Sequence, residues 1–179
     1  MSCLYITPSE RRILMKIRMA EQKDIPMMTR LLYQVCDVHA QGRPDLFVSG
    51  GRKYTEQELE ALLKDDSRPI LAAADDDDKM VGYAFCVMQD HRSDTAMTDI
   101  ITLYLDNLCV DEAHRGEHIG TALYKAVLEY AKERGCYNVT LNVWSCNPSA
   151  MRFYEAMGMS TQKICMEQIV GQSPEKDKP

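Results

Sequence analysis

The most informative stretch for the fold is residues 101–123, ITLYLDNLCVDEAHRGEHIGTAL. The first ten residues are strand-like, and the pattern becomes helical at Ile119. Between them lies a turn with Arg115, Gly116 and Gly120. The N-terminus of a helix carries unpaired N–H groups and the positive end of the helix dipole. The stretch therefore predicts an anion site at a strand-to-helix turn, with a glycine-capped surface turn as the alternative.

The turn lacks the two common phosphate-binding signatures. A Walker loop requires Gly-Lys-Ser/Thr, and a dinucleotide fingerprint requires Gly-x-Gly-x-x-Gly. Neither occurs here. An ordinary ATP- or NAD-binding domain is therefore a remote interpretation.

Apolar periodicity and capping signals along the rest of the chain predict a mixed α/β domain over residues 15–170, with an extension at 1–14 and a polar tail at 171–179. We expect strands at residues 15–20, 69–74, 79–88, 101–110, 137–143 and 160–169. We expect helices at residues 25–40, after the capping box at 55–58, at 119–134, and from 147 to 158. Aspartates 75–78 predict a solvated hairpin tip rather than a metal site.

Composition excludes several functions. The formal charge of −6 argues against nucleic-acid binding, and no apolar run is long enough to span a membrane. The seven cysteines are odd in number and scattered, with no Cys-x-x-Cys pair and no zinc-like spacing to the four histidines. We expect free, mostly buried thiols, no metal and a cytoplasmic protein.

A second motif lies downstream, where the strand-like YNVTLNVW is followed by SCNPSAMRFYEAMGM, residues 137–159. Together the two motifs resemble the GNAT superfamily of acetyl-CoA-dependent N-acetyltransferases, over residues 15–169. The family pattern Gln/Arg-x-x-Gly-x-Gly/Ala is matched by Arg115 and Gly120 but not by His118, which stands at the first glycine. Histidine is one of the non-glycine residues found at positive φ, at a cost of about 1–2 kcal/mol.

The resemblance implies a mostly antiparallel twisted sheet flanked by helices, with two splayed central strands that bind acetyl-CoA. Backbone groups of Leu108 and Val110 would meet the pantetheine arm at the free strand edge. Asn147 would hydrogen-bond the same arm, besides capping its helix. The remaining cofactor-binding residues implied by the family are Arg115, Gly116, His118, Ile119, Gly120, Thr121 and Tyr154.

The chemistry of acetyl transfer needs an acid and a base. Tyr154 is the expected general acid, which protonates the departing thiolate. The glutamate that some relatives use as base is replaced by Asn142. The resemblance implies a second base position at Tyr104, and Asp106 lies two residues on, on the same strand face. The candidate base is Asp106 directly, or either residue through water. A purely structural Asp106 stays open as well. Cys109 alternates away from Asp106, which favours a buried structural thiol.

These residues predict direct acetyl transfer to a primary amine in a ternary complex. The alternative is a non-catalytic CoA-binding regulatory module. The acceptor could be a small-molecule amine, an aminoglycoside, a lysine side chain or a protein N-terminus; Asn142 disfavours the last. Family resemblance places His39 and residues 43–47 over the acceptor site, where Asp45 and Phe47 could line it; an ordinary packed loop is the alternative. The resemblance is also compatible with a homodimer.

Overall fold

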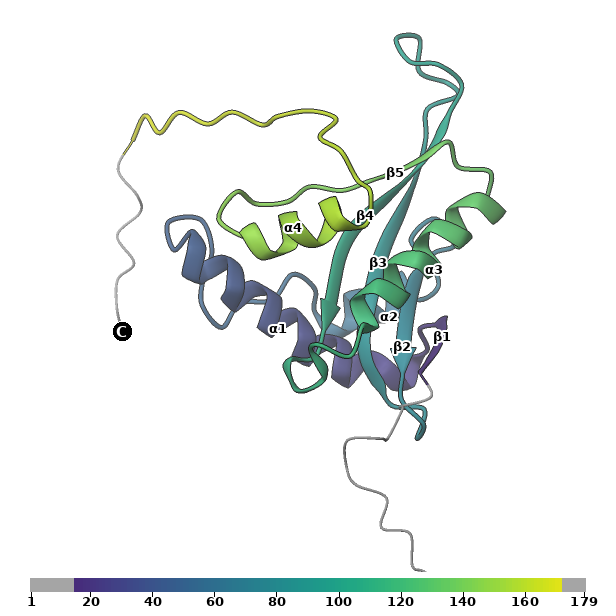
Figure 1. Ribbon diagram of the computed structural model, residues 1–179, viewed down its shortest axis with the longest axis vertical. Coiled ribbons are helices and arrows are strands. Elements are labelled where there is room, and N and C mark those ends of the chain that lie inside the picture. The colour runs from purple at the N-terminus through teal and green to yellow at the C-terminus, as the bar shows by residue number, and fades with distance from the viewer. Residues whose placement is uncertain (1–14, 172–179) are drawn as a thin grey trace, which may run out of the picture.

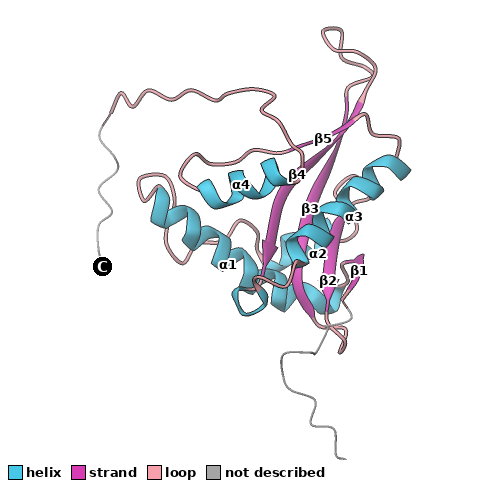
Figure 2. Cartoon of the chain, in the orientation of Figure 1, coloured by secondary structure: helices cyan, strands magenta, loops and turns pink. Residues whose placement is uncertain are grey.

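The computed structural model describes residues 15–171 (Figure 1); the expected extension at 1–14 and residues 172–179 of the expected tail lie outside them. The described residues form five strands, four α-helices and two short 3-10 turns (Figure 2). The strands are β1 (Lys16–Met19), β2 (Ile70–Ala74), β3 (Met80–Asp90), β4 (Ile101–Val110) and β5 (Asn138–Thr140). The α-helices are α1 (Ile25–Gly42), α2 (Glu56–Leu62), α3 (Ile119–Glu133) and α4 (Pro148–Ala156), and the 3-10 turns are Gln22–Asp24 and Glu112–His114.

The sheet is mixed and mostly antiparallel, in the order β1-β2-β3-β4-β5. The first four strands pair antiparallel, and β5 alone pairs parallel, with β4. Local signals place most of these elements. The Thr55–Glu58 capping box is formed in both directions, and Gly135, at φ +70°, follows the end of α3.

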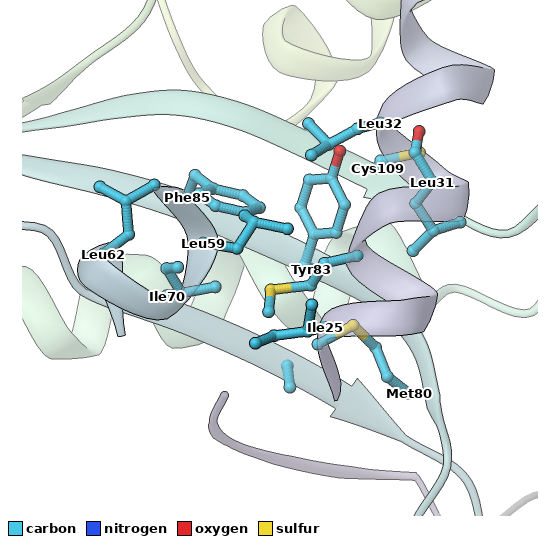
Figure 3. Close-up of a cluster of buried hydrophobic side chains, with 12 residues drawn as sticks. Ile25, Leu31, Leu32, Leu59, Leu62, Ile70, Met80, Tyr83, Phe85 and Cys109 are labelled. Atoms are coloured by element: carbon cyan, nitrogen blue, oxygen red, sulfur yellow. The ribbon is translucent and has the colours of Figure 1, made fainter. Parts of the chain in front are cut away.

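Two layers of helices cover the sheet. Helices α1 and α2 pack on one face, where the core cluster contains Leu31, Leu59, Tyr83 and Phe85 (Figure 3). Helix α3 packs on the other face, and Phe153 and Tyr154 of α4 join that second cluster. Burial of apolar side chains on both faces holds the two helix layers to the sheet.

All three residues of β5 pair with the beginning of β4, from Thr102↔Asn138 to Tyr104↔Thr140. Beyond Tyr104, β4 continues for six residues with no paired strand on that side in the described chain. The expected splay between the two central strands is therefore present, and it leaves a backbone edge free from Leu105 to Val110.

A β-bulge lies at the start of this free edge. Asn107 pairs with Phe85 and Leu105 pairs with Cys86, so Asp106 is an extra residue on β4. A bulge bends its strand and redirects its side chains. Here Leu105 and Leu108 both face α3, whereas Asp106 and Cys109 both lie on the α1 face.

Two expected strands differ from the structure. Residues 137–143 form a strand only at Asn138–Thr140, and residues 160–169 form none. A strand requires a paired neighbour, and the backbone pairing of β5 with β4 ends at Tyr104↔Thr140, where the two strands separate. The later segment makes no backbone hydrogen bond to the described sheet, and its Ile164 and Met166 are 76% and 86% exposed.

Of the seven cysteines, the six in residues 15–171 are all free thiols, as expected. Only Cys86 and Cys109 are fully buried, and Cys165 is exposed, so "mostly buried" is wrong for this set. Within the same residues, no helix has both the length and the apolar character needed to cross a membrane.

Candidate active site

The turn between β4 and α3 contains backbone N–H groups that make no hydrogen bond within the described residues. Gly116 has φ +86° and His118 has φ +60°, the left-handed conformation expected for the histidine. No side chain caps the helix at His118, and the first intrahelical bond is from the Ala122 N–H to the His118 carbonyl, at 3.1 Å. The N–H groups of Ile119, Gly120 and Thr121 are therefore free to meet an anion.

Side chains at the turn divide into structural and exposed ones. Ile119 is buried in the α3-face core, so only its backbone can reach a ligand. Arg115 is exposed and makes no ion pair with the part of the chain that the structure describes. Asp111 is buried and anchors the loop by accepting a 3.1 Å hydrogen bond from the Ala113 N–H. An uncapped helix N-terminus beside an unpaired arginine fits a diphosphate.

Leu108 and Val110 lie on the free edge of β4, between this turn and the bulge. Their side chains pack into the α3-face core, which leaves the backbone as the part that can bind. Such an edge pairs with extended molecules much as a strand would. The edge runs from the anion turn toward Asp106.

Asn147 caps α4, which is one of the two roles expected for it; the other is a hydrogen bond to the cofactor arm. Its Oδ1 accepts hydrogen bonds from the Ala150 N–H at 3.2 Å and from the Ser149 hydroxyl at 2.9 Å. Pro148 occupies the first turn, where a missing N–H costs nothing. The cap fixes the start of the helix that carries Tyr154.

Tyr154 lies on the α3 face of the sheet, half-buried among aromatic rings. Its ring centroid is 5.1 Å from that of Phe153 and 6.0 Å from that of Tyr124. Burial raises the pKa of the Tyr154 phenol well above its ordinary value, with smaller contributions from Tyr124 and Cys86. A phenol with its ordinary pKa of about 10 is already protonated at neutral pH, as a proton donor must be, and burial preserves that state.

Asp106 lies on the opposite, α1 face and is already paired. Lys53 Nζ lies 2.6 Å from both carboxylate oxygens, and the Tyr54 hydroxyl donates a 3.1 Å hydrogen bond to Oδ2. Burial lowers the pKa of Lys53, but hydrogen bonding to and attraction by Asp106 outweigh it and raise the pKa overall. The carboxylate thus holds an ammonium group at the bulge.

The second candidate base, Tyr104, lies beside the residue that replaces the family's glutamate. Asn142 Nδ2 donates a 3.1 Å hydrogen bond to the Tyr104 hydroxyl. Asn142 lies just beyond the end of β5, at the point where the two strands separate. The pair is a polar bridge across the opening of the splay.

An aromatic cluster flanks this opening. Phe47 lies 5.0 Å from His39 and 5.1 Å from Trp144, measured between ring centroids. Asp45 is bound to Arg43, which also pairs with Glu167 at 2.9 Å. Of the residues expected over the acceptor site, His39 and Phe47 thus come together, whereas the Asp45 carboxylate is engaged by Arg43.

Cys109 is buried, as expected, although the alternation argument for it is wrong. The bulge brings Asp106 and Cys109 to the same face of the sheet. Burial raises the pKa of the Cys109 thiol to about 12, with Arg115 acting in the opposite direction. A protonated, buried thiol is a poor nucleophile.

Sequence patterns did not identify Lys53, Tyr54 or Trp144 as neighbours of the site. Lys53 and Asp106 are 53 residues apart, and no local pattern links them. Trp144 carried a weak signal, since it ends the strand-like run before the α4 motif. Trp144 is the chain's single tryptophan and is 40% exposed, although tryptophan side chains are on average highly buried.

Comparison with known proteins identifies the class. The model of the acetyltransferase (GNAT) family matches residues 32–159, more than two thirds of the chain. The chain therefore belongs to the GNAT family, as the resemblance predicted. Members of this family use acetyl-CoA as co-substrate and acetylate amines.

Particular relatives add detail. A mutant of the BH1408 protein from Bacillus halodurans is 30% identical, with a TM-score of 0.81, covering 87% of this chain and 99% of that one. N-alpha-acetyltransferase 30 of Schizosaccharomyces pombe is 32% identical over 88 residues, 49% of this chain and 55% of the relative. Thialysine N-epsilon-acetyltransferase of Bos taurus is 38% identical over 56 residues, 31% of this chain and 33% of the relative. The matches thus span about half or less of these two curated relatives.

Proposed function

We propose that this protein transfers the acetyl group of acetyl-CoA to a primary amine by direct attack. The free β4 edge between the α3 turn and the bulge at Asp106 is the observation that carries the proposal. Acetyl-CoA supplies an activated thioester. Arg115, with the N–H groups from Gly116 to Thr121, would hold the pyrophosphate, and the backbone at Leu108 and Val110 would hold the pantetheine arm.

The two faces of the sheet supply the two proton transfers. Tyr154 approaches from the α3 face and donates a proton to the departing sulfur. Asp106 and Tyr104 face the other way, where an acceptor amine must lose a proton before it attacks. Because Asp106 already binds the Lys53 ammonium, its role is to attract and orient the acceptor cation as well as to accept a proton. The α4 cap uses Oδ1 of Asn147, so its amide N–H groups would supply the hydrogen bond to the cofactor arm.

The proposed acceptor is an amine on a flexible alkyl stem. Two relatives are named for α-amine and ε-amine acetylation. Asn142 stands where the family resemblance implies a glutamate in enzymes that modify protein N-termini, and it therefore disfavours an α-amine. The aromatic cluster of His39, Phe47 and Trp144 would pack against the stem. We further propose a reducing cytoplasmic location, from the free thiols, and a homodimer, which light scattering would test.

The test is thiol release from acetyl-CoA with lysine, thialysine, polyamines, aminoglycosides and short peptides as acceptors. We expect turnover with an ε-type amine. Tyr154→Phe should keep CoA affinity by calorimetry and lose turnover by about 10²–10⁴-fold, since it removes only the acid. CoA binding without turnover on any amine would favour the regulatory-module alternative. Absence of CoA binding would overturn both.

A further inference from the structure

The lysine at the bulge is placed as an acceptor would be. Lys53 Nζ lies 2.6 Å from each oxygen of Asp106, the candidate base, and 5.3 Å from the centroid of the Tyr54 ring. Asp106 itself lies where the free β4 edge begins. The chain therefore brings its own alkyl ammonium group to the point at which an external amine would lose its proton.

The surroundings of Lys53 leave it accessible. Its side chain is 45% exposed, whereas that of Asp106 is 12% exposed. It belongs to the connection at residues 43–55 between α1 and α2. An amine in such a connection can move over short distances without disturbing the core.

We propose that Lys53 is an internal acetyl acceptor, modified by the protein's own bound acetyl-CoA when no external amine occupies the site. This inference rests on the proposed function and extends it to a covalent modification of the chain.

The step balances as an ordinary aminolysis. The pairing with Asp106 favours the ammonium form of Lys53, so the reacting species is the small fraction that has given one proton to Asp106. Its neutral Nζ attacks the acetyl carbonyl, and the N–C bond forms as the C–S bond breaks and the departing thiolate takes a proton from Tyr154. The second proton of the nitrogen returns Tyr154 to its neutral form through solvent, and Asp106 releases its proton to solvent. The products are Nε-acetyl-Lys53 and free CoA, with no change of oxidation state.

Modification would alter the site. Acetylation removes the positive charge of Lys53 and its ion pair with Asp106. The carboxylate would then meet an incoming amine without a competing cation. External amines, conversely, compete with Lys53 and should slow its modification.

The test is a time course of the full chain with isotopically labelled acetyl-CoA, followed by mass spectrometry of each lysine-containing peptide. Lys23 is the matched control, because its side chain is 48% exposed and also bound to carboxylates, Asp78 and Glu21, at the hairpin 75–78. We expect label on Lys53 at least about tenfold faster than on Lys23, because a positioned acid alone contributes about 10²-fold or more. The fraction labelled per unit time should not depend on protein concentration.

Variants separate enzymatic from spontaneous acetylation. Tyr154→Phe should slow labelling of Lys53 by about 10²-fold and leave Lys23 unchanged. In Lys53→Arg, the remaining lysines should carry no more label than they do in the parent. The arginine keeps the positive charge and therefore the ion pair with Asp106. An accepted amine from the panel should slow Lys53 labelling in the parent.

Turnover on amines with Lys53 labelled no faster than Lys23 would overturn this inference and leave the proposed function intact. Labelling that rises with protein concentration would also overturn it, since the donor would then be another molecule. Failure to bind CoA would overturn the proposed function and the inference together.

Discussion

Tyr83 is the most unusual single residue of the core. Its side chain is fully buried on the α1 face, where Figure 3 shows the ring beside Phe85 and the α1 residues Leu31 and Leu32. The hydroxyl has no hydrogen-bond partner among the described residues. A buried, unsatisfied polar group costs free energy that an apolar replacement would not.

We therefore predict that Tyr83→Phe raises the free energy of unfolding by about 1 kcal/mol, measured by urea denaturation. Tyr54→Phe is the matched control with the opposite sign, because it removes the hydrogen bond to Asp106. It should lower the free energy by about 1 kcal/mol. A loss of stability in Tyr83→Phe would indicate an ordered water on the hydroxyl instead.

The two glycines of the anion turn are predicted to respond differently to alanine. Gly116 has open space around it but φ +86°, so Gly116→Ala should cost about 1–2 kcal/mol of unfolding free energy. Gly120 is helical, and a methyl group there would meet Phe153 at 3.6 Å and Val110 at 3.8 Å, which is ordinary contact. Gly120→Ala should be neutral or stabilising by about 0.5 kcal/mol. Thermal unfolding of the two variants measures the difference. An equal loss of stability in both would contradict the assignment of strain to Gly116.

At the scale of elements, the β2–β3 hairpin is tied to the N-terminal segment by ion pairs. Arg18 binds Asp78 at 2.8 Å and Asp24 at 2.7 Å, and Lys23 also binds Asp78. Asp78 has φ +58°, the left-handed turn conformation that aspartate and asparagine tolerate. The acidic tip expected to be solvated is thus also a docking point for the strand β1.

This network predicts a pH dependence. Hydrogen bonds from Lys23 and then Arg18 lower the pKa of Asp78 to about 2, below its unfolded value of about 3.9. A lowered folded pKa contributes stability above about pH 4, which is lost as the pH falls toward 2. Asp78→Asn should therefore reduce stability at pH 7. It should also make the loss of stability between about pH 4 and 2 smaller than in the parent. The unfolding temperature, measured across this pH range, checks both.

Asp76→Asn is the control for that experiment. Asp76 lies at the same tip and makes no ion pair within residues 15–171. Its pH profile should match that of the parent. A parent-like profile in Asp78→Asn would show that the ion pairs to Arg18 and Lys23 contribute nothing in solution.

In the whole molecule, the proposed cofactor site lies where three elements of the α3-face core meet. The α3 turn, the free edge of β4 and the start of α4 would all meet one ligand. A ligand that binds only the folded state stabilises it, by about 2.7 kcal/mol at a concentration 100 times its Kd. CoA should therefore raise the unfolding temperature of the parent.

Hydrogen exchange should localise that effect. With CoA, amides of residues 105–110 and 116–121 should exchange more slowly, while those of the hairpin tip at 75–78 should not change. The tip serves as the internal control. Protection confined to α1 and α2 would contradict the proposed binding edge.

The sequence by itself determined the elements whose signals are local. The capping box at Thr55, the glycine after α3, the cap at Asn147 and the left-handed His118 all follow from short-range backbone chemistry. Apolar periodicity alone predicted the strand at 101–110 and the helix from 119. Together they were sufficient to indicate the family.

Tertiary structure alone decided the features that depend on pairing. Strand β5 is short and residues 160–169 are unpaired because a strand exists only where another edge accepts its hydrogen bonds. The bulge at Asp106 arises from the register of β3 against β4, and it reverses the face of Cys109. Lys53 contacts Asp106 only because the chain folds a distant loop onto the sheet, and such a long-range contact cannot be predicted from side-chain periodicity.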